Sequence, residues 1–220
     1  MKQIVKMREP RLLKQHKSKQ FASFDNIPIE AKKELRNNLL IEQGYICCYC
    51  MRRIHSEQMK IEHFKCQNYN EELQLEYSNL LGVCLGGEGS PMQLQTCDTR
   101  KRNLGLSINP SAKEPNCESF FKYNANGEIS SNNNDEEVNR QIEDVLNLNM
   151  QTLKDYRREV YLVVQRKIET ESKKQPDKHL KIGYLTKERD RWLSKCKEGK
   201  FKEFCMVAVY YLNKKIKANL

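Results

Sequence analysis

The chain has 220 residues, of which 38% are hydrophobic and 31% charged, and it carries a net charge of +10. This excess of basic residues favours a nucleic-acid partner, because Lys and Arg bind phosphates and release counterions, although it does not separate DNA from RNA. No apolar run is long enough to span a membrane. With nine cysteines, an odd number, and no signal peptide, we expect a cytoplasmic protein without disulfides.

Residues 1–25 form a basic N-terminal segment. Glu9 is the one acidic residue within its first twenty positions. The basic residues there are Lys2, Lys6, Arg8, Arg11, Lys14, Lys17 and Lys19. Two interpretations stay open: the segment binds nucleic acid, or it is a flexible solvated tail.

A helix is predicted from Pro28 to about Gln43. Proline suits an early turn of a helix, and Gly44 suits the position just after its end. This helix leads into a central region, residues 26–110, that holds the residues with recognisable chemistry.

Four cysteines in this region have the arrangement of a zinc site. Cys47 and Cys50 form a C-x2-C turn that lets two thiolates converge on one tetrahedral ion. Cys84 and Cys97 supply a second pair, separated by a loop rich in glycine and containing Pro91. The alternative is that these cysteines are buried free thiols. We expect one structural Zn²⁺.

A short strand is predicted around Lys60–Phe64, and it carries Glu62 beside His63. Neighbours on a strand point to opposite faces, so both can serve one site only where the strand ends or bends. A histidine there can take a proton from water, and a carboxylate can hold a hard divalent cation. The alternative is a surface pair without a function.

Together these positions resemble the motif of the HNH endonuclease family. The resemblance rests on Cys47 and Cys50, Glu62-His63, Asn79 followed by Cys84, and Cys97-Asp98-x-x-Lys101. The family motif folds as a hairpin plus a helix, called ββα-metal. Two departures are present, since members usually have Asp-His at Glu62-His63 and Asn or His at Asp98.

The resemblance also implies roles for individual residues. His63 resembles the general base, and Glu62 and Asp98 resemble the ligands of a catalytic Mg²⁺ or Mn²⁺. Asn79 resembles the central asparagine, which orients the histidine or the loop. Lys101 lies one turn beyond Asp98 and could contact a phosphate of the nucleic acid.

One branch of the family is especially similar, over segments 40–54 and 61–65. This branch contains the HNH nuclease subunit of Septu-type and retron-associated anti-phage systems, which works beside an ATPase. Cys66 stands where the branch often has proline. The resemblance covers residues 26–105, and it implies an ATPase subunit as the partner.

Residues 111–220 are predicted to be a hairpin followed by helices. Segments 120–123 and 128–130 flank Asn126-Gly127, a typical hairpin turn. Apolar residues then recur at helical spacing from near Asp135 to Val163. A polar linker at 172–180 and helices at 187–197 and 199–217 complete the prediction. The last helix offers a surface on which a partner could dock.

The sequence therefore predicts an α+β protein with a zinc-stabilised ββα-metal nuclease core in a mainly α-helical frame. Its predicted function is metal-dependent hydrolysis of phosphodiester bonds, as the nuclease of a bacterial anti-phage complex. Two alternatives remain: a non-catalytic zinc-ribbon module that binds nucleic acid, and a subunit whose main role is to dock the ATPase.

Overall fold

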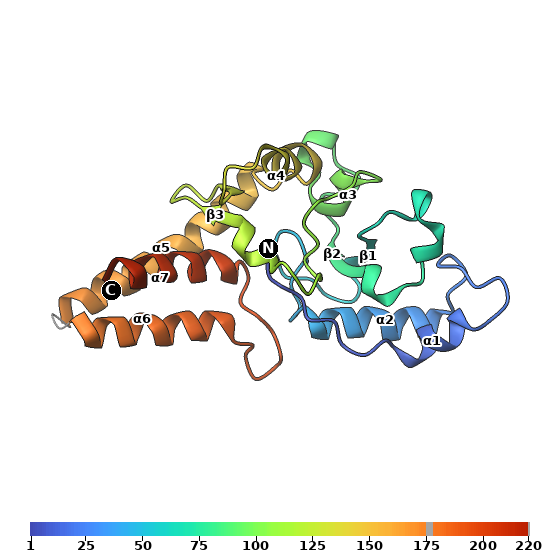
Figure 1. The fold of residues 1–220 in the computed structure, drawn as a ribbon, viewed down its shortest axis with the longest axis horizontal. Coiled ribbons are helices and arrows are strands. Elements are labelled where there is room, and N and C mark those ends of the chain that lie inside the picture. The colour runs from blue at the N-terminus through green and yellow to red at the C-terminus, as the bar shows by residue number, and fades with distance from the viewer. Residues whose placement is uncertain (175–177, 220) are drawn as a thin grey trace.

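The computed structural model describes residues 1–174 and 178–219, and these form an α+β fold. Helices surround two small antiparallel sheets of two strands each. Figure 1 shows an elongated molecule, with α1, α2, β1, β2 and α3 toward one end and α5, α6 and α7 toward the other. The predicted fold class is confirmed at this level. No described helix is long and apolar enough to cross a membrane.

The first two helices are α1 (Arg11–Lys17) and α2 (Ile29–Glu42). Helix α2 confirms the helix predicted from Pro28, which precedes its first residue. Gly44 follows with a φ of +58°. A side chain at this position would collide with the ring of Phe201, so glycine allows the C-terminal part of the chain to pack here.

The basic N-terminal segment packs against the rest of the protein. Met1, Ile4 and Leu13 are buried in the core. Three of its lysines form ion pairs: Lys2 with Glu118, Lys6 with Glu42, and Lys17 with Glu9 and Glu76. A free solvated tail therefore does not describe this segment, and much of its charge is neutralised within the chain.

The central hairpin pairs β1 (Met59–His63) with β2 (Leu80–Cys84) in antiparallel register. The loop between them contains three short 3-10 turns, Gln67–Tyr69, Glu71–Leu73 and Tyr77–Asn79. All five residues of β2 are buried, because this strand lies between β1 and the core. A further 3-10 turn (Met92–Leu94) precedes the short helix α3 (Cys97–Lys101).

A second hairpin, β3 (Phe121–Tyr123) with β4 (Ile129–Ser131), confirms the predicted hairpin around Asn126-Gly127. A 3-10 turn (Cys117–Phe120) leads into it. Phe121, Tyr123 and Ile129 are buried, so one face of this small sheet joins the common core.

The prediction of one long helix from Asp135 is wrong. The structure has α4 (Glu136–Arg140), a π-helical turn (Gln141–Val145), an irregular connection and then α5 (Gln151–Lys174). Asn147 adopts a φ of +48°. Its side-chain amide donates to the carbonyls of Gln93 and Gln95, which lie in the loop before α3. The apolar spacing continues across this break because both helices bury residues in the same core.

The last two helices are α6 (Lys178–Leu193) and α7 (Cys205–Asn219), which lie side by side with α5 (Figure 1). Both differ from the predicted bounds. The predicted linker at 172–180 is helical at 172–174 and 178–180, and residues 175–177 lie outside the described residues. Phe204 is buried, and its N–H donates to the Met51 carbonyl. The start of α7 therefore packs inside the protein.

Replacement of Gly127 by alanine should destabilise the protein. Gly127 has a φ of +82°, and an added Cβ would lie 2.0 Å from the Lys154 carbonyl oxygen. We expect Gly127→Ala to lower the free energy of unfolding by more than about 1 kcal/mol, measured as a lower Tm by thermal denaturation. Gly105→Ala is the matched control, since its Cβ would meet nothing within 4 Å. Equal melting of the two variants would show that the close approach of Lys154 to Gly127 does not constrain the fold.

Candidate metal and catalytic site

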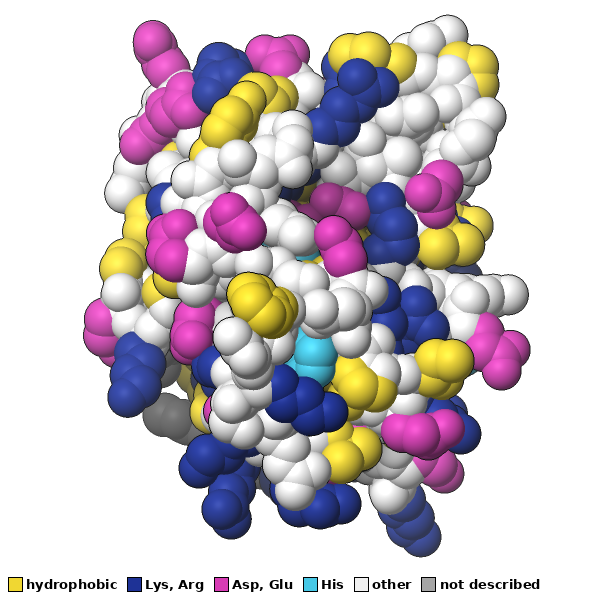
Figure 2. All heavy atoms as spheres, turned by 90° about the vertical axis from the view of Figure 1, so that its right-hand side faces the viewer, with side chains coloured by type: hydrophobic (Ala, Val, Ile, Leu, Met, Phe, Trp, Pro, Cys, Tyr) yellow, Lys and Arg dark blue, Asp and Glu magenta, His cyan; other side chains and the backbone are white. Residues whose placement is uncertain are grey.

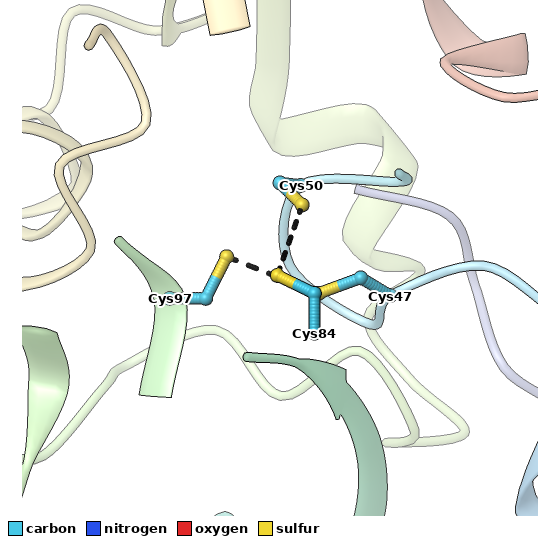
Figure 3. A group of neighbouring side chains, drawn as sticks. All are labelled: Cys47, Cys50, Cys84 and Cys97. Carbon is cyan, nitrogen blue, oxygen red and sulfur yellow. Dashed lines mark hydrogen bonds between the residues drawn. The ribbon is translucent and has the colours of Figure 1, made fainter. Parts of the chain in front are cut away.

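Four buried cysteines converge at one point of the structure. The sulfurs of Cys47, Cys50, Cys84 and Cys97 all lie within 4.8 Å of one another. The Cys47–Cys97 separation is 3.9 Å and the Cys50–Cys84 separation is 3.8 Å. A tetrahedral ion with Zn–S bonds of about 2.3 Å places its sulfurs about 3.8 Å apart. The cluster, shown in Figure 3, therefore fits a structural zinc in both ligand type and geometry.

Local backbone geometry aims each sulfur at the centre of this cluster. Cys47 and Cys50 lie in a tight turn closed by a hydrogen bond from Met51 N–H to the Cys47 carbonyl. Met51 has a φ of +66°, and Cys97, at the first position of α3, has a φ of +56°. Non-glycine residues adopt such values only where surrounding structure imposes them. Cys84 ends β2, so three separate segments meet at the sulfurs.

The protonation of the cluster also favours a cation. Burial disfavours a Cys47 thiolate, but hydrogen bonds from the neighbouring thiols outweigh it and lower the pKa of Cys47. The same contacts raise the pKa values of Cys50 and Cys97. Thiolates are the form in which cysteines bind zinc, and a bound zinc would stabilise all four of them.

Glu62 and Asp98 form a pair of carboxyl groups close to the cysteine cluster. Glu62 comes from β1, and Asp98 comes from the first turn of α3. Burial and the neighbouring Asp98 raise the pKa of Glu62 to about 8. Burial alone would raise the pKa of Asp98, but hydrogen bonds from Glu62 and Lys60 lower it. Glu62 is therefore the member of the pair that holds a proton more readily, as expected for carboxyls that converge.

Three further groups hold these carboxyls in place. The Tyr49 hydroxyl donates to Glu62 Oε1 over 2.8 Å. Lys101 Nζ lies 2.9 Å from the same oxygen, and Lys60 Nζ lies 2.8 Å from Asp98 Oδ2. Two carboxylates are suitable ligands for Mg²⁺ or Mn²⁺. In this conformation, however, a lysine ammonium already contacts each of them.

His63 lies at the end of β1, as a shared site with Glu62 requires. Its Nε2 lies 2.9 Å from the carbonyl oxygen of Gln74, so Nε2 carries the proton and the lone pair is on Nδ1. The ring of Phe24 packs against the imidazole edge-on, with centroids 4.4 Å apart. Burial lowers the pKa of His63, which favours the neutral form that a general base requires.

Asn79 fastens the loop between the two strands. Its side-chain oxygen accepts a hydrogen bond from Lys65 N–H, and its amide donates to the carbonyls of Lys65 and Leu73. Gln74, whose carbonyl orients His63, directly follows Leu73. Asn79 therefore acts on the histidine through the loop.

Lys101 does not lie where a phosphate could reach its ammonium group. The side chain is completely buried. The residue borders a groove of about 380 Å³ at the end of α3, whose lining also includes Arg100, Arg102 and Asp144. The expected contact with nucleic acid would therefore require a movement of this side chain.

Sequence reasoning missed Tyr49, Lys60, Gln74 and Phe24. Tyr49 lies between two of the zinc-ligand cysteines and Lys60 precedes the Glu62-His63 pair by two positions, so both lie within the motif itself. Gln74 contributes mainly its backbone carbonyl, which no residue type reveals. Phe24 is distant in sequence, and its contact with His63 depends on the tertiary fold.

The surface around this end of the molecule carries charges of both signs. Figure 2 shows basic side chains interspersed with acidic ones, and the basic side chains are more numerous toward the lower edge of this view. The charge of the whole chain is therefore not concentrated into one uniformly basic face on this side.

Comparison with known proteins gives two relatives. The chain is 31% identical over 102 residues to "Retron Vc95 putative HNH endonuclease" of Vibrio cholerae serotype O1 biovar El Tor, which covers 45% of the chain and 47% of the relative. It is 36% identical over 81 residues to "Retron Ec83 putative HNH endonuclease" of Escherichia coli, which covers 31% of each. No protein-family model matches the chain.

Both relatives are named as retron-associated HNH endonucleases, and the chain is similar to them over part of its length. The predicted resemblance to this family is thereby confirmed. The chain spans less than half the length of either curated relative. The cysteine cluster and the carboxyl pair therefore belong to a chain whose two relatives are named as putative HNH endonucleases.

The first test of this site concerns zinc. Cys50→Ser should lower the zinc content of the purified protein from one ion per chain to near zero and should cause unfolding or aggregation, because the metal joins three segments. Cys48→Ala is the matched control, since Cys48 is equally buried but lies outside the cluster. Metal analysis of both proteins gives the answer, and a Cys50→Ser protein that retains zinc would contradict the assignment.

A second test concerns Asn79. Asn79→Ala removes three hydrogen bonds, which we expect to cost about 1–3 kcal/mol. Amide hydrogen exchange in residues 64–79 should accelerate while zinc content stays normal. Asn70→Ala removes a single side-chain bond, to the Cys66 carbonyl, and should have a smaller effect. Unchanged exchange in Asn79→Ala would show that the loop does not depend on this residue.

Proposed function

We propose that this chain is a metal-dependent HNH endonuclease that hydrolyses phosphodiester bonds of a nucleic acid. The observation that carries the proposal is the pairing of Glu62 with Asp98 in a β1–β2–α3 unit that also contains His63 and four converging cysteines. A zinc site that only stabilises the fold requires the cysteines but not the carboxyl pair. We assign this unit as a zinc-stabilised ββα-metal core.

In this proposal each residue of the site has a separate task. Glu62 and Asp98 would hold the catalytic Mg²⁺ or Mn²⁺, which supplies charge neutralisation at the scissile phosphate when bound. His63 accepts the proton of the attacking water at Nδ1, because Nε2–H is committed to the Gln74 carbonyl. Asn79 keeps that carbonyl in place, and the Tyr49 hydroxyl keeps Glu62 in orientation.

The biological setting of the proposal follows from the relatives. Both are named as parts of retrons. We infer a role as the nuclease of a bacterial anti-phage system, in the cytoplasm, acting with an ATPase subunit as in the Septu-type branch. A helical C-terminal part, residues 111–220, would serve as the docking region, with residues 26–110 as the nuclease core and 1–25 as a basic segment.

A second candidate function is a non-catalytic subunit that binds nucleic acid or docks the ATPase. One observation favours it: the ammonium groups of Lys101 and Lys60 contact both proposed ion ligands. If these pairs are permanent, the unit keeps its zinc and its shape but cannot perform metal-dependent cleavage. The two functions differ in whether His63 is needed for activity.

The decisive experiment is the replacement of His63 by alanine. Cleavage of plasmid DNA, single-stranded DNA and structured RNA is measured with Mg²⁺ or Mn²⁺, in the absence and presence of the ATPase. We expect His63→Ala to reduce the rate by about 10²-fold or more, with normal zinc content. His55→Ala is the control, since His55 is exposed and outside the site. Full activity in His63→Ala would exclude the mechanism, and an inactive wild-type protein under all conditions would favour the non-catalytic function.

A further inference from the structure

Lys101 is a lysine with no exposed side-chain surface. Lysine is almost never fully buried unless its charge is compensated. The compensation comes from Glu62, whose Oε1 lies 2.9 Å from Nζ, and from the backbone carbonyl of His63 at 3.4 Å. The ammonium group is therefore bound to the residues that form the proposed catalytic centre.

The Lys101 ammonium lies beside the carboxyl pair, where a bound metal cation would also lie. It contacts the same Glu62 oxygen that accepts the Tyr49 hydrogen bond. Glu62 in turn lies close enough to Asp98 for each carboxyl to shift the pKa of the other. A divalent ion held by these two carboxylates would lie within a few ångströms of Nζ, in a region with little water to screen the repulsion.

Lys60, the second lysine of the site, is more exposed to solvent than Lys101. Lys60 is paired with Asp98 and with the Thr99 hydroxyl, but a quarter of its side chain (25%) is exposed. It can turn into solvent without leaving a cavity. Lys101 has no exposed side-chain surface, and its residue borders the groove at the end of α3 that also contains Arg100 and Arg102.

We propose that Lys101 is a built-in competitor of the catalytic divalent ion. While its ammonium lies on Glu62, the carboxyl pair binds Mg²⁺ or Mn²⁺ weakly. When the ammonium moves toward the groove, the pair gains the negative charge that a divalent ion requires. Lys101 thus sets the ion affinity of the site and keeps the chain in a resting state. This inference rests on the proposed function for the identity of the ion ligands.

The test measures Mn²⁺ binding to the zinc-loaded chain by calorimetry and by electron paramagnetic resonance. Mn²⁺ does not compete with Zn²⁺ for thiolates. Lys101→Met keeps most of the side-chain volume but removes the charge, and we expect it to bind Mn²⁺ about tenfold or more tightly than the wild type. Adding Asp98→Asn to Lys101→Met should abolish the gain, because one of the two carboxylates is lost.

Two controls make the charge effect specific to Lys101. Lys33→Met removes one positive charge from an exposed position of α2 and should leave Mn²⁺ binding unchanged. Lys60→Met should give a smaller gain than Lys101→Met. Unchanged or weaker binding in Lys101→Met, a gain that survives Asp98→Asn, or a larger gain in Lys60→Met would each overturn the proposal.

Folding of the variant is monitored by zinc content and melting temperature. If Lys101→Met does not fold, Lys101→Gln repeats the test, since an amide can still donate to Glu62. Failure of both to fold would also overturn the proposal, because a displaceable ammonium must be dispensable for the fold. The binding assay does not need cleavage. If Lys101→Met leaves Mn²⁺ affinity unchanged while cleavage depends on His63, this inference alone is refuted. If Lys101→Met binds Mn²⁺ more tightly but no cleavage is found, only the nuclease function is refuted.

Discussion

The convergence of four cysteines is the constraint on which the rest of the structure depends. Cys47 and Cys50 follow α2, Cys84 ends β2 and Cys97 begins α3, so one metal bound by the four sulfurs would join three segments. The central hairpin has two strands of five residues, and a sheet of that size is marginal in water without further support. Zinc binding energy would supply this support and would fix the distance between β1 and α3, which carry Glu62 and Asp98.

Backbone carbonyls and buried polar groups position the residues of the site built on this brace. Asn79 fixes the loop, the Gln74 carbonyl selects the His63 tautomer, and Tyr49 orients Glu62. Such supporting contacts matter because a catalytic group must be positioned to within a fraction of an ångström. The zinc cluster and the carboxyl pair are connected through Tyr49, which lies between two cysteine ligands in sequence. Loss of zinc should therefore disturb the carboxyl pair as well as the fold.

Local sequence signals predicted a large part of this structure. The C-x2-C turn, the helix before Gly44 and the hairpin at Asn126-Gly127 depend on neighbouring residues, and they were predicted from those residues. The break between α4 and α5 was not, because it arises from Asn147 bonding to a loop about fifty residues earlier in the chain. The pairing of Lys101 with Glu62 was missed for a similar reason. A lysine one helical turn after Asp98 can point to solvent or inward, and the choice depends on packing between α3 and β1.

The charge of the chain shows the same dependence on tertiary structure. A net charge of +10 suggests a strongly basic surface, yet several lysines are used within the protein. Lys6 and Lys101 are paired with the buried carboxylates of Glu42 and Glu62, and Figure 2 shows acidic groups among the remaining basic ones. Since binding of nucleic acid depends on the phosphates that free cations can neutralise, the affinity of this chain should be lower than its net charge implies. A partner that adds cationic surface, or that draws Lys101 out of the carboxyl pair, would then control both substrate binding and ion binding at the same site.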